Sequence, residues 1–484
     1  MNSFKDASAL ALAIRQKEVS AAEIVEDTIL RAKKSNKALN AITADRYEEA
    51  LTEAKKGDFK QGIFAGVPIF LKDLGQDMEG LPTSSGSRLF QHYFPKQTDY
   101  YVERLQELGF IILGKTNTPE FGFKNISDSK ANGPVNLPMA NSRNAGGSSG
   151  GAAALLSAGI TTLGPASDGG GSIRIPASFN GLIGLKPSRG RIPVGPSSYR
   201  GWQGASVHFA LTKSVQDTRA LLYHMQTYQV ESPFPLAKLS KDQLYSKELK
   251  PLKVACLLQT PDGKPLPQEA YDAVLKASQF LEASGHHVFS LQKLPLEMHD
   301  VMSSYYFMNA AETAAMFQHI ESGLNRAITK NDMETMTWAI YQNGLNLKAK
   351  DYALHLQKWD AFSVTMAHLH EEYDLLLTAT TTQVAPKHGQ LDPDAHLMAK
   401  LSLAEEASKE EQTALIYDMF DKGLAVNPYT PLANLTGQPA ISLPTHVTKE
   451  GLPLGIQLLV AKGREDLLLA VAEQFESAQQ FKTF

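Results

Sequence analysis

Residues 145–160 read AGGSSGGAAALLSAGI, and residues 166–178 read ASDGGGSIRIPAS. Such a density of Gly and Ser is also typical of a flexible linker. Here, however, the glycines enclose an apolar helical segment and are followed by the strand-like run LIGLK at 182–186. Because glycine permits positive φ angles and close backbone approaches, we interpret this region as an ordered, glycine-lined site inside a folded core.

Strand and helix patterns alternate on both sides of this core. GVPIFLKD (66–73) and GFIILGKTN (109–117) predict buried strands, with a helix over 100–108 between them. Downstream, LKVACLL, a helix over 268–283 and HHVFSL predict a strand, helix, strand unit, and YDLLLTAT, PAISLP and LGIQLLV predict further strands. The alternation predicts one large α/β unit whose sheet is completed by segments from both ends of the chain.

The first 60 residues and the stretch 300–420 are predicted to be mainly helical. Ser20 and Glu23 have the spacing of a capping box, which predicts a helix from Ala21 to about Asn36. A final helix is expected from Arg464 to Glu476.

Composition excludes several classes of protein. The chain has 484 residues and is 43% hydrophobic, which is typical of a globular protein and not of a disordered or collagenous one. Its 47 basic and 51 acidic residues give a net charge of -4, so we expect no nucleic-acid partner. The single Cys256 excludes an intrachain disulfide and a cysteine-rich metal site, and fits a reducing cytoplasm.

Targeting signals are also missing from the sequence pattern. The first residues lack the basic start and cleavage site of a signal peptide. Uncharged apolar runs fall well short of the roughly 20 residues that cross a bilayer. We therefore expect a cytoplasmic protein with no membrane partner.

Two motifs match known chemistry by letter but lack its context. GFIILGKT (109–116) fits the phosphate-loop pattern, yet the residues that should form the loop are themselves a strand. Gly146, Ser148 and Gly150 fit the G-x-S-x-G elbow of α/β-hydrolases, but no buried strand precedes them, and the tail from residue 427 offers only His446. A Ser-His-Asp esterase stays a weaker alternative.

The pair His368 and His370 raises the question of a metal site. On a helix these positions point to different faces, so a solvated helical surface is the better interpretation. We predict no metal and no cofactor.

Three separated motifs together resemble the amidase signature family of serine hydrolases. Lys72 ends the strand in GVPIFLKD, Ser148 lies in GGSSGG, and Ser172 closes SDGGGS 24 residues later. GKTNTPEF, GLKPSRGRIP, TGQPAISLP and LPLGIQLLV continue the resemblance. It implies a large single-domain α/β fold in which a mixed, twisted central sheet is covered by helices on both faces. Residues 1–484 would form one amidase domain, with a helical N-terminal segment (1–60), a catalytic core (61–220), a variable peripheral region (221–420) and a C-terminal segment completing the core sheet (421–484).

The resemblance also implies a catalytic triad. Ser172 would be the nucleophile, Ser148 the proton relay and Lys72 the base, and the reaction would pass through an acyl-enzyme. An ordinary lysine has a pKa of about 10.4 and is a poor base at neutral pH. The mechanism therefore requires that Lys72 is buried at the end of its strand, since burial disfavours the ammonium form.

The loop before the nucleophile is implied to form an oxyanion hole. Without side chains, Gly169, Gly170 and Gly171 would let several N–H groups point at one oxygen. Most family members have Thr or Ile at position 169 and Thr at position 167, where this chain has Gly and Ser.

The resemblance also implies supporting residues around this loop. Ser149, Asp168 and Arg174 are expected to hold it through hydrogen bonds, with Ser149 donating near Ser148. An exposed Asp168–Arg174 ion pair is the alternative.

The expected activity is hydrolysis of a linear or cyclic carboxylic amide to a carboxylate and an amine or ammonia. The alternative within the family is the glutamine-hydrolysing A subunit of a tRNA-dependent amidotransferase, which normally reads GRVSRYGL where this chain reads GRIPVGP at 190–196. That difference favours a stand-alone amidase acting on a small-molecule amide, as a monomer or homodimer. The residues expected to wall the pocket are Phe121, Phe123, Asn125, Tyr199, Trp202 and parts of 300–400.

Overall fold

An eight-stranded mixed sheet lies at the centre of the computed structural model, which describes residues 4–246 and 249–482. Its strand order is β10-β9-β11-β13-β12-β7-β8-β6. The strands are β6 (Gly164–Asp168), β7 (Ile183–Lys186), β8 (Val207–Thr212), β9 (Lys253–Cys256), β10 (His287–Ser290), β11 (Leu375–Ala379), β12 (Ala440–Val447) and β13 (Pro453–Leu459). β9 pairs in parallel with β10 and β11, and the other pairs are antiparallel. The predicted α/β class with a mixed sheet is confirmed.

The N-terminal strands form a second sheet of their own. Its three strands, in the order β1-β3-β2, are β1 (Ile42–Asp45), β2 (Pro68–Lys72) and β3 (Ile111–Thr116). β2 and β3 lie where the sequence predicts strands, but they pair with each other and with β1 instead of entering the large sheet. The prediction that both chain ends complete one sheet is therefore right for β12 and β13 and wrong for the N-terminal strands. A short third sheet joins β4 (Asn136–Leu137) and β5 (Ala140–Asn144).

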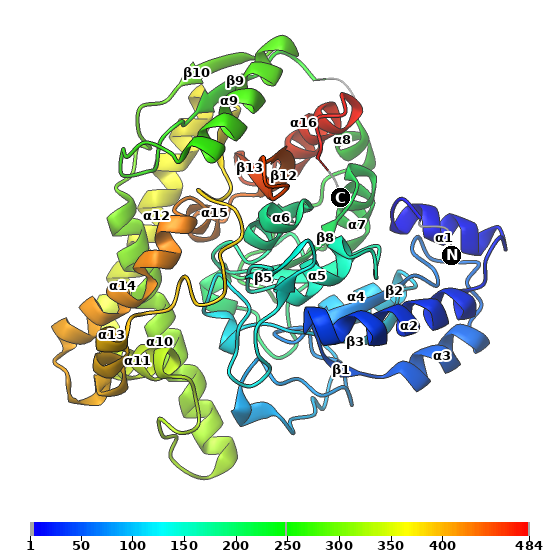
Figure 1. The fold of residues 1–484 in the computed structure, drawn as a ribbon. Helices are drawn as coiled ribbons and strands as arrows, with labels where there is room; N and C mark the ends of the chain where they lie inside the picture. Colours follow the sequence, from blue (N-terminus) through cyan, green and yellow to red (C-terminus); the bar gives the residue numbers. More distant parts are fainter. Residues whose placement is uncertain (1–3, 247–248, 483–484) are drawn as a thin grey trace.

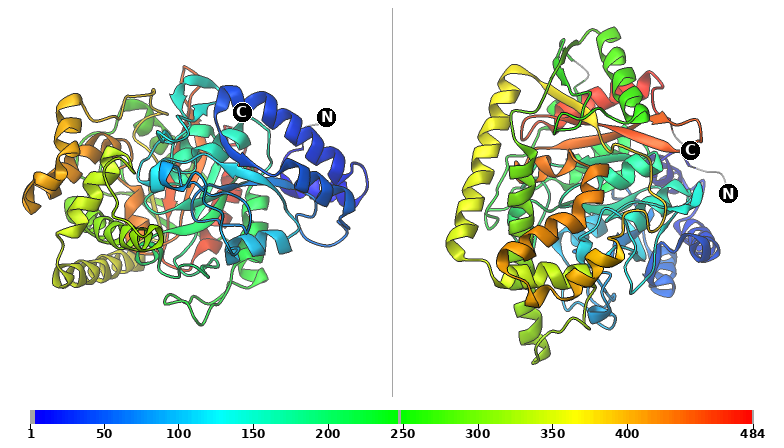
Figure 2. Two further views of the ribbon diagram at one scale, coloured as in Figure 1. Left: turned by 90° about the horizontal axis from the view of Figure 1, so that it is seen from below. Right: turned by 60° about the vertical axis from the view of Figure 1, so that its left-hand side comes forward.

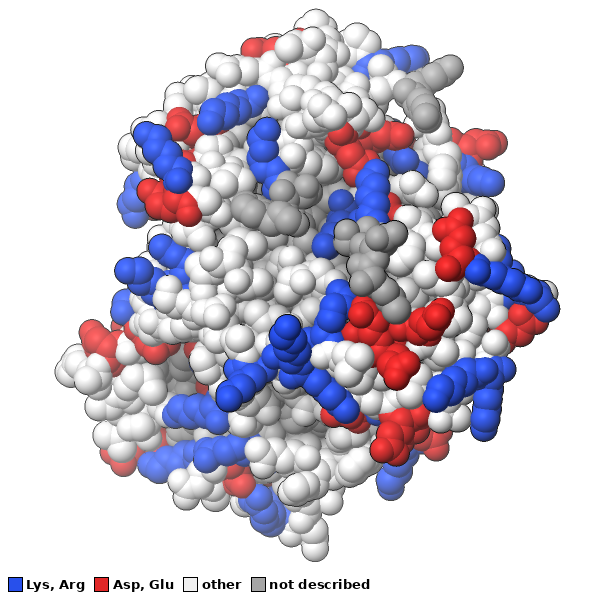
Figure 3. Space-filling model, turned by 45° about the vertical axis from the view of Figure 1, so that its right-hand side comes forward, with Lys and Arg blue, Asp and Glu red and all other residues white. Residues whose placement is uncertain are grey.

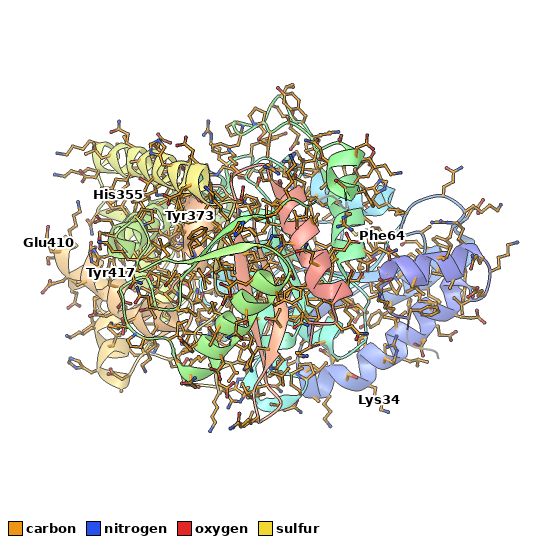
Figure 4. The ribbon with its side chains drawn as sticks, turned by 90° about the horizontal axis from the view of Figure 1, so that it is seen from above. Lys34, Phe64, His355, Tyr373, Glu410 and Tyr417 are labelled. Carbon is orange, nitrogen blue, oxygen red and sulfur yellow. The ribbon has the colours of Figure 1, made fainter. Side chains whose placement is uncertain are left out.

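The N-terminal helices are α1 (Ala7–Arg15), α2 (Ala21–Leu39) and α3 (Tyr47–Lys56), and they lie beside the small sheet (Figure 1). The predicted capping box is present, because the Ser20 side chain accepts from the Glu23 N–H and Glu23 accepts from the Ser20 N–H. α2 ends three residues later than predicted, at Leu39, and its C-cap Asn40 adopts the left-handed conformation. In Figure 4 Lys34 of α2 points into solvent, whereas Phe64, which is fully buried, lies inside.

A helical layer covers the opposite side of the molecule from α1, α2 and α3 (Figures 1 and 2). It consists of α10 (Met298–Leu324), α11 (Thr335–Leu345), α12 (Ala349–Glu372), α13 (Ala395–Ser402) and α14 (Lys409–Val426). The predicted helical character of 300–420, interrupted by the strand β11, is confirmed. α10 packs against both α11 and α12, and one of its faces lines the cavity described below.

The remaining helices lie around the two sheets. They are α4 (Tyr100–Glu107), α5 (Gly150–Ser157), α6 (Arg174–Asn180), α7 (Val215–Met225), α8 (Lys241–Tyr245), α9 (Gln268–Ala283), α15 (Thr430–Leu435) and α16 (Glu465–Ser477). The bounds of α9 coincide with the predicted helix over 268–283. The boundaries predicted near residues 60, 220 and 420 stay predictions.

Charges of both signs are mixed on the molecular surface. On the face in Figure 3, Lys and Arg side chains alternate with Asp and Glu, as expected for a net charge of -4. Within the described ranges, none of the helices combines the length and the apolar character that crossing a membrane demands.

Candidate active site

A cavity lies where the glycine-rich loops meet α10. Its volume is about 460 Å³. The side chains of Ser148, Ser167 and Ser172 line it, together with the backbone of Gly169 and Gly170. The sequence-predicted serines and glycines are thus brought to one place, and Lys72 lies directly behind them.

Lys72 is the last residue of β2 and is fully buried. Its Nζ donates to Ser148 Oγ at 2.7 Å and to Ser167 Oγ at 3.0 Å. Its backbone N–H donates to Gln76 Oε1 at 2.7 Å. Burial lowers the pKa of Lys72 to about 7, and the Asp168 carboxylate limits the decrease. With a pKa near 7, a large fraction of such lysine side chains is neutral at neutral pH.

Ser148 lies in the loop between β5 and α5, after a cis Gly147–Ser148 peptide bond. A Cβ at Gly147 would lie 2.7 Å from the backbone of Ile126, so only glycine fits there. The N–H of Ser149 donates to the carbonyl of Ser172 at 3.3 Å, which holds the two serine loops side by side. The Ser149 hydroxyl donates to the carbonyl of Ser167 at 3.3 Å.

Ser172 follows the glycine loop, two residues before α6 begins, and is half-buried. Its side chain lines the same cavity as Ser148. Within residues 4–246 and 249–482, no hydrogen bond joins the two hydroxyls. The structure therefore contains the Lys72–Ser148 hydrogen bond and places Ser172 on the same cavity wall.

Asp168 and Arg174 hold the glycine loop from behind. Their side chains are both 0% exposed and form a bidentate pair, with Arg174 Nε and Nη2 at 2.9 and 2.8 Å from the carboxylate oxygens. Asn434 Nδ2 also donates to the carboxylate, at 2.9 Å. Burial alone would raise the pKa of Asp168, but Arg174 and Asn434 lower it well below its ordinary value. This geometry does not fit the alternative of an exposed ion pair.

The three loop glycines do not have the same surroundings. The Gly171 N–H donates to Asp168 Oδ1 at 2.7 Å, so it is already engaged. This is a correction to the expectation that Gly169, Gly170 and Gly171 all present N–H groups to one oxygen. The reason is that the Asp168 carboxylate turns back under its own loop. Gly169 and Gly170 line the cavity.

Gly171 has a φ of +130°, and a Cβ there would lie 2.4 Å from Thr430 Oγ1. The same Thr430 hydroxyl donates to the carbonyl of Gly170 at 2.7 Å. Glycine is therefore required at position 171 both by the backbone angle and by the close approach of α15.

Several residues that shape the site were missed by the sequence analysis. Ser167 was noted only as a departure from the family, although its hydroxyl contacts Lys72. Gln76, Thr430 and Asn434 hold Lys72 and the glycine loop, and Tyr305 of α10 packs against Gly170. Only Gln76 has a sequence signal, a polar residue four positions after Lys72. The others come from distant segments.

Aromatic rings form much of the cavity wall. Phe123 stacks on Trp202 with ring centroids 6.0 Å apart, and Trp202 meets Tyr305 edge-on at 6.1 Å. Four residues expected to wall the pocket do line it, namely Phe121, Phe123, Asn125 and Trp202. Tyr199 does not line this cavity but a smaller neighbouring one. Among the described residues, no group of three or more His, Cys, Asp and Glu side chains could hold a metal ion.

The protein has an α/β fold and a cavity with serines on its wall and a buried lysine behind them. These are features of a serine hydrolase. A family model described as Amidase matches residues 23–469. The chain belongs to the amidase family, which supports an amide-hydrolysing enzyme.

Named relatives agree with this family. The chain is similar to a lipoamidase of Enterococcus faecalis, with 38% identity over 485 residues that cover 98% of this chain. It spans only 63% of the length of that lipoamidase. It is also 32% identical to the 6-aminohexanoate-cyclic-dimer hydrolase of Paenarthrobacter ureafaciens, covering 98% of this chain and 95% of that protein.

A solved structure of a 6-aminohexanoate cyclic dimer hydrolase superimposes on the fold with a TM-score of 0.89 and 30% identity. The match covers 99% of this chain and 97% of that one. The predicted amidase-signature fold is therefore confirmed.

Proposed function

We propose that this protein hydrolyses carboxylic amides through an acyl-enzyme, with Ser172 as nucleophile, Ser148 as proton relay and Lys72 as base. The observation that carries the proposal is the buried hydrogen bond of 2.7 Å between Lys72 Nζ and Ser148 Oγ. An amine whose pKa is lowered to about 7 can accept a proton at neutral pH, which an ordinary lysine rarely does.

In the proposed reaction, Ser172 Oγ attacks the amide carbonyl. The proton of Ser172 passes to Ser148, whose own proton passes to Lys72. The Ser172–Ser148 hydrogen bond forms when the substrate carbonyl orients the nucleophile, since catalytic hydrogen bonds often tighten only in the substrate complex. The N–H groups of Gly169 and Gly170 stabilise the oxyanion, and the relay then protonates the leaving amine. Water finally attacks the acyl-enzyme and releases the carboxylate.

Covalent labelling tests the nucleophile. A fluorophosphonate probe should label the wild-type protein, and Ser172→Ala should abolish both labelling and amide turnover. Ser198→Ala, which changes another serine of the cavity wall, should keep both. Labelling that persists in Ser172→Ala would assign the nucleophile to a different hydroxyl.

A stand-alone amidase is favoured over a glutamine-hydrolysing subunit by the charge of the cavity. Among the described residues, neither Lys nor Arg lines its wall. The α-carboxylate of glutamine would therefore enter without a cationic partner, which is costly in a desolvated site. Glutaminase activity of the purified chain that exceeds its activity on simple aryl and alkyl amides would reverse this preference.

The Ser-His-Asp alternative has less support. His446 Nε2 contacts Glu269 at 2.7 Å, and His446 is not among the residues that line the cavity.

A small-molecule amide as partner, a cytoplasmic location, the lack of a nucleic-acid partner and a monomeric or homodimeric state belong to the same proposal. The location and the lack of a nucleic-acid partner rest on cysteine content and charge, and the small-molecule amide rests on the amidase family. Size-exclusion chromatography with light scattering tests the oligomeric state.

A further inference from the structure

We propose that Glu312 binds an ammonium group of the substrate, so that the preferred amides carry a primary amine on a flexible apolar arm. This inference rests on the proposed amidase function and narrows it to a substrate class. It follows from the placement of Glu312 on α10, from its hydrogen bonds and from the charge of the cavity wall.

The position of Glu312 along α10 sets its distance from the reaction centre. Tyr305, Asn309 and Glu312 occupy one face of this helix, and all three line the cavity. Tyr305 marks the reaction centre, because a Cβ on Gly170 would lie 2.7 Å from its hydroxyl. Glu312 follows seven residues later, and an α-helix advances by about 10 Å over that length. The backbone of Glu312 is thus two helical turns along α10 from that of Tyr305.

Hydrogen bonds hold this carboxylate through one of its two oxygens. Gln203 Nε2 donates to Glu312 Oε1 at 3.0 Å, and the hydroxyl of Tyr352 donates to the same oxygen. In the part of the chain that the structure describes, Oε2 has no hydrogen-bond partner and Glu312 forms no ion pair. A fixed carboxylate with one oxygen left over is suited to a charge-assisted hydrogen bond from an ammonium group.

Among the described residues, no Lys or Arg side chain lines the cavity or forms an ion pair with Glu312. The charged side chains of the described wall are all acidic, namely Asp77, Asp99 and Glu312. The buried Lys115 interacts electrostatically with Asp77 and Asp99. On the side of Glu312, Arg200 contacts the amide oxygen of Gln203 at 3.5 Å and acts electrostatically on Tyr352, so this positive charge lies near the carboxylate without pairing with it.

The cavity also has apolar side chains on its wall, which suits a methylene arm. They include Phe123, Met302, Met316, Phe420 and Leu424. An alkyl chain that leaves water for such a wall contributes about 0.8 kcal/mol per buried methylene group. The arm would thus be held by its methylenes and oriented by its terminal charge.

The test compares amides that differ only at the end of the arm. Octanoyl p-nitroanilide, its ω-amino derivative and its ω-carboxy derivative are assayed with the wild-type protein. We expect kcat/KM for the amino substrate to exceed that for the methyl-ended one about tenfold, and the carboxy substrate to be the poorest. A second series places the same termini on the amine side of the bond. Preference in either series supports the proposal and shows which side occupies this arm of the cavity.

Two variants separate the role of Glu312 from general effects of charge. Glu312→Gln keeps the size of the side chain and should remove the roughly tenfold preference while leaving the methyl-ended substrate within about twofold of wild type. Asp300→Asn removes the same charge from the exposed start of the same helix and should keep the preference.

Two results would overturn the inference while leaving the proposed amidase function intact. They are equal turnover of amino and methyl substrates by the wild type in both series, and a preference that survives in Glu312→Gln. Absence of turnover with every amide, together with absence of fluorophosphonate labelling, would instead refute the proposed function itself.

Discussion

At the scale of single residues, Lys72 combines two properties that oppose each other. Full burial disfavours its charge, and that same burial makes the neutral amine available as a base. Two serine hydroxyls satisfy the amine in place of water. A site of this kind lowers the stability of the fold, because burying an amine costs more free energy than burying an apolar side chain of similar size.

The lowered pKa of Lys72 predicts the pH dependence of activity. The active form is the neutral amine, so kcat/KM should fall about tenfold per pH unit below about 7 and level off above it. Lys72→Ala should reduce kcat/KM by about 10² to 10⁴ near neutrality and less at high pH, where hydroxide can act as the base. Initial rates measured between about pH 5 and about pH 10 test both effects. An unchanged profile in Lys72→Ala would remove Lys72 from the mechanism.

The buried pair of Asp168 and Arg174 predicts a large effect on stability. Arg174→Met leaves the Asp168 carboxylate uncompensated, and loss of one partner of a buried pair typically costs about 3 to 5 kcal/mol of unfolding free energy. Arg464→Met breaks the pair with Asp466, in which the arginine is 53% exposed, and should cost at most about 1 kcal/mol. Urea unfolding of both variants measures the difference. Equal losses would show that Asp168 does not depend on Arg174.

Some residues of the candidate site could be predicted from the sequence and others could not. Lys72, Ser148 and Ser172 could be predicted because the motifs around them resemble those of the amidase signature family. Asn434 and Tyr305 could not be predicted, because their functional contacts join segments that are far apart in the chain. No spacing rule encodes such contacts, which depend on how whole elements pack.

At the scale of elements, local periodicity was a reliable guide. The bounds of α9 agree with its hydrophobic pattern and the start of α2 with its capping box, because both signals act within a few residues. The partner of β2 was not predictable in the same way. An apolar run shows that a strand is buried, but it does not show which sheet the strand joins.

The glycine loop between β6 and α6 predicts a sharp intolerance to side chains. Gly171→Ala adds a Cβ 2.4 Å from Thr430 Oγ1 at a φ of +130°, so we expect a loss of about 2 to 4 kcal/mol and a clear fall in kcat. Gly451→Ala is the matched control, since Gly451 also has a positive φ but nothing lies within 4 Å of its Cβ position. It should cost about 1 kcal/mol and leave kcat unchanged. Thermal unfolding and kcat are measured for both variants. A similar kcat in the two would show that the glycine loop tolerates displacement.

At the scale of the whole molecule, the site lies where two sheets meet. Lys72 ends β2 in the small sheet, whereas Ser167 and the glycine loop follow from β6 at the edge of the large sheet. No strand pairing connects β2 and β6, so the distance between Lys72 and Ser172 depends on side chains that cross the junction. Gln76 is such a side chain, because it accepts from the Lys72 N–H and donates to the Ala166 carbonyl at 3.1 Å.

This arrangement predicts that breaking the junction lowers activity beyond its effect on stability. Gln76→Leu leaves two buried backbone groups unpaired, at a cost of about 1 to 3 kcal/mol each, and frees β2 to move relative to β6. Gln438→Leu removes two hydrogen bonds from an equally buried glutamine whose partners, Thr436 and Val460, lie outside the junction. Both variants should unfold at lower urea concentration, but only Gln76→Leu should lose more than about tenfold in kcat/KM, because small misplacements of catalytic groups are costly. Equal kcat/KM in the two folded variants would mean that packing alone holds Lys72 against Ser148.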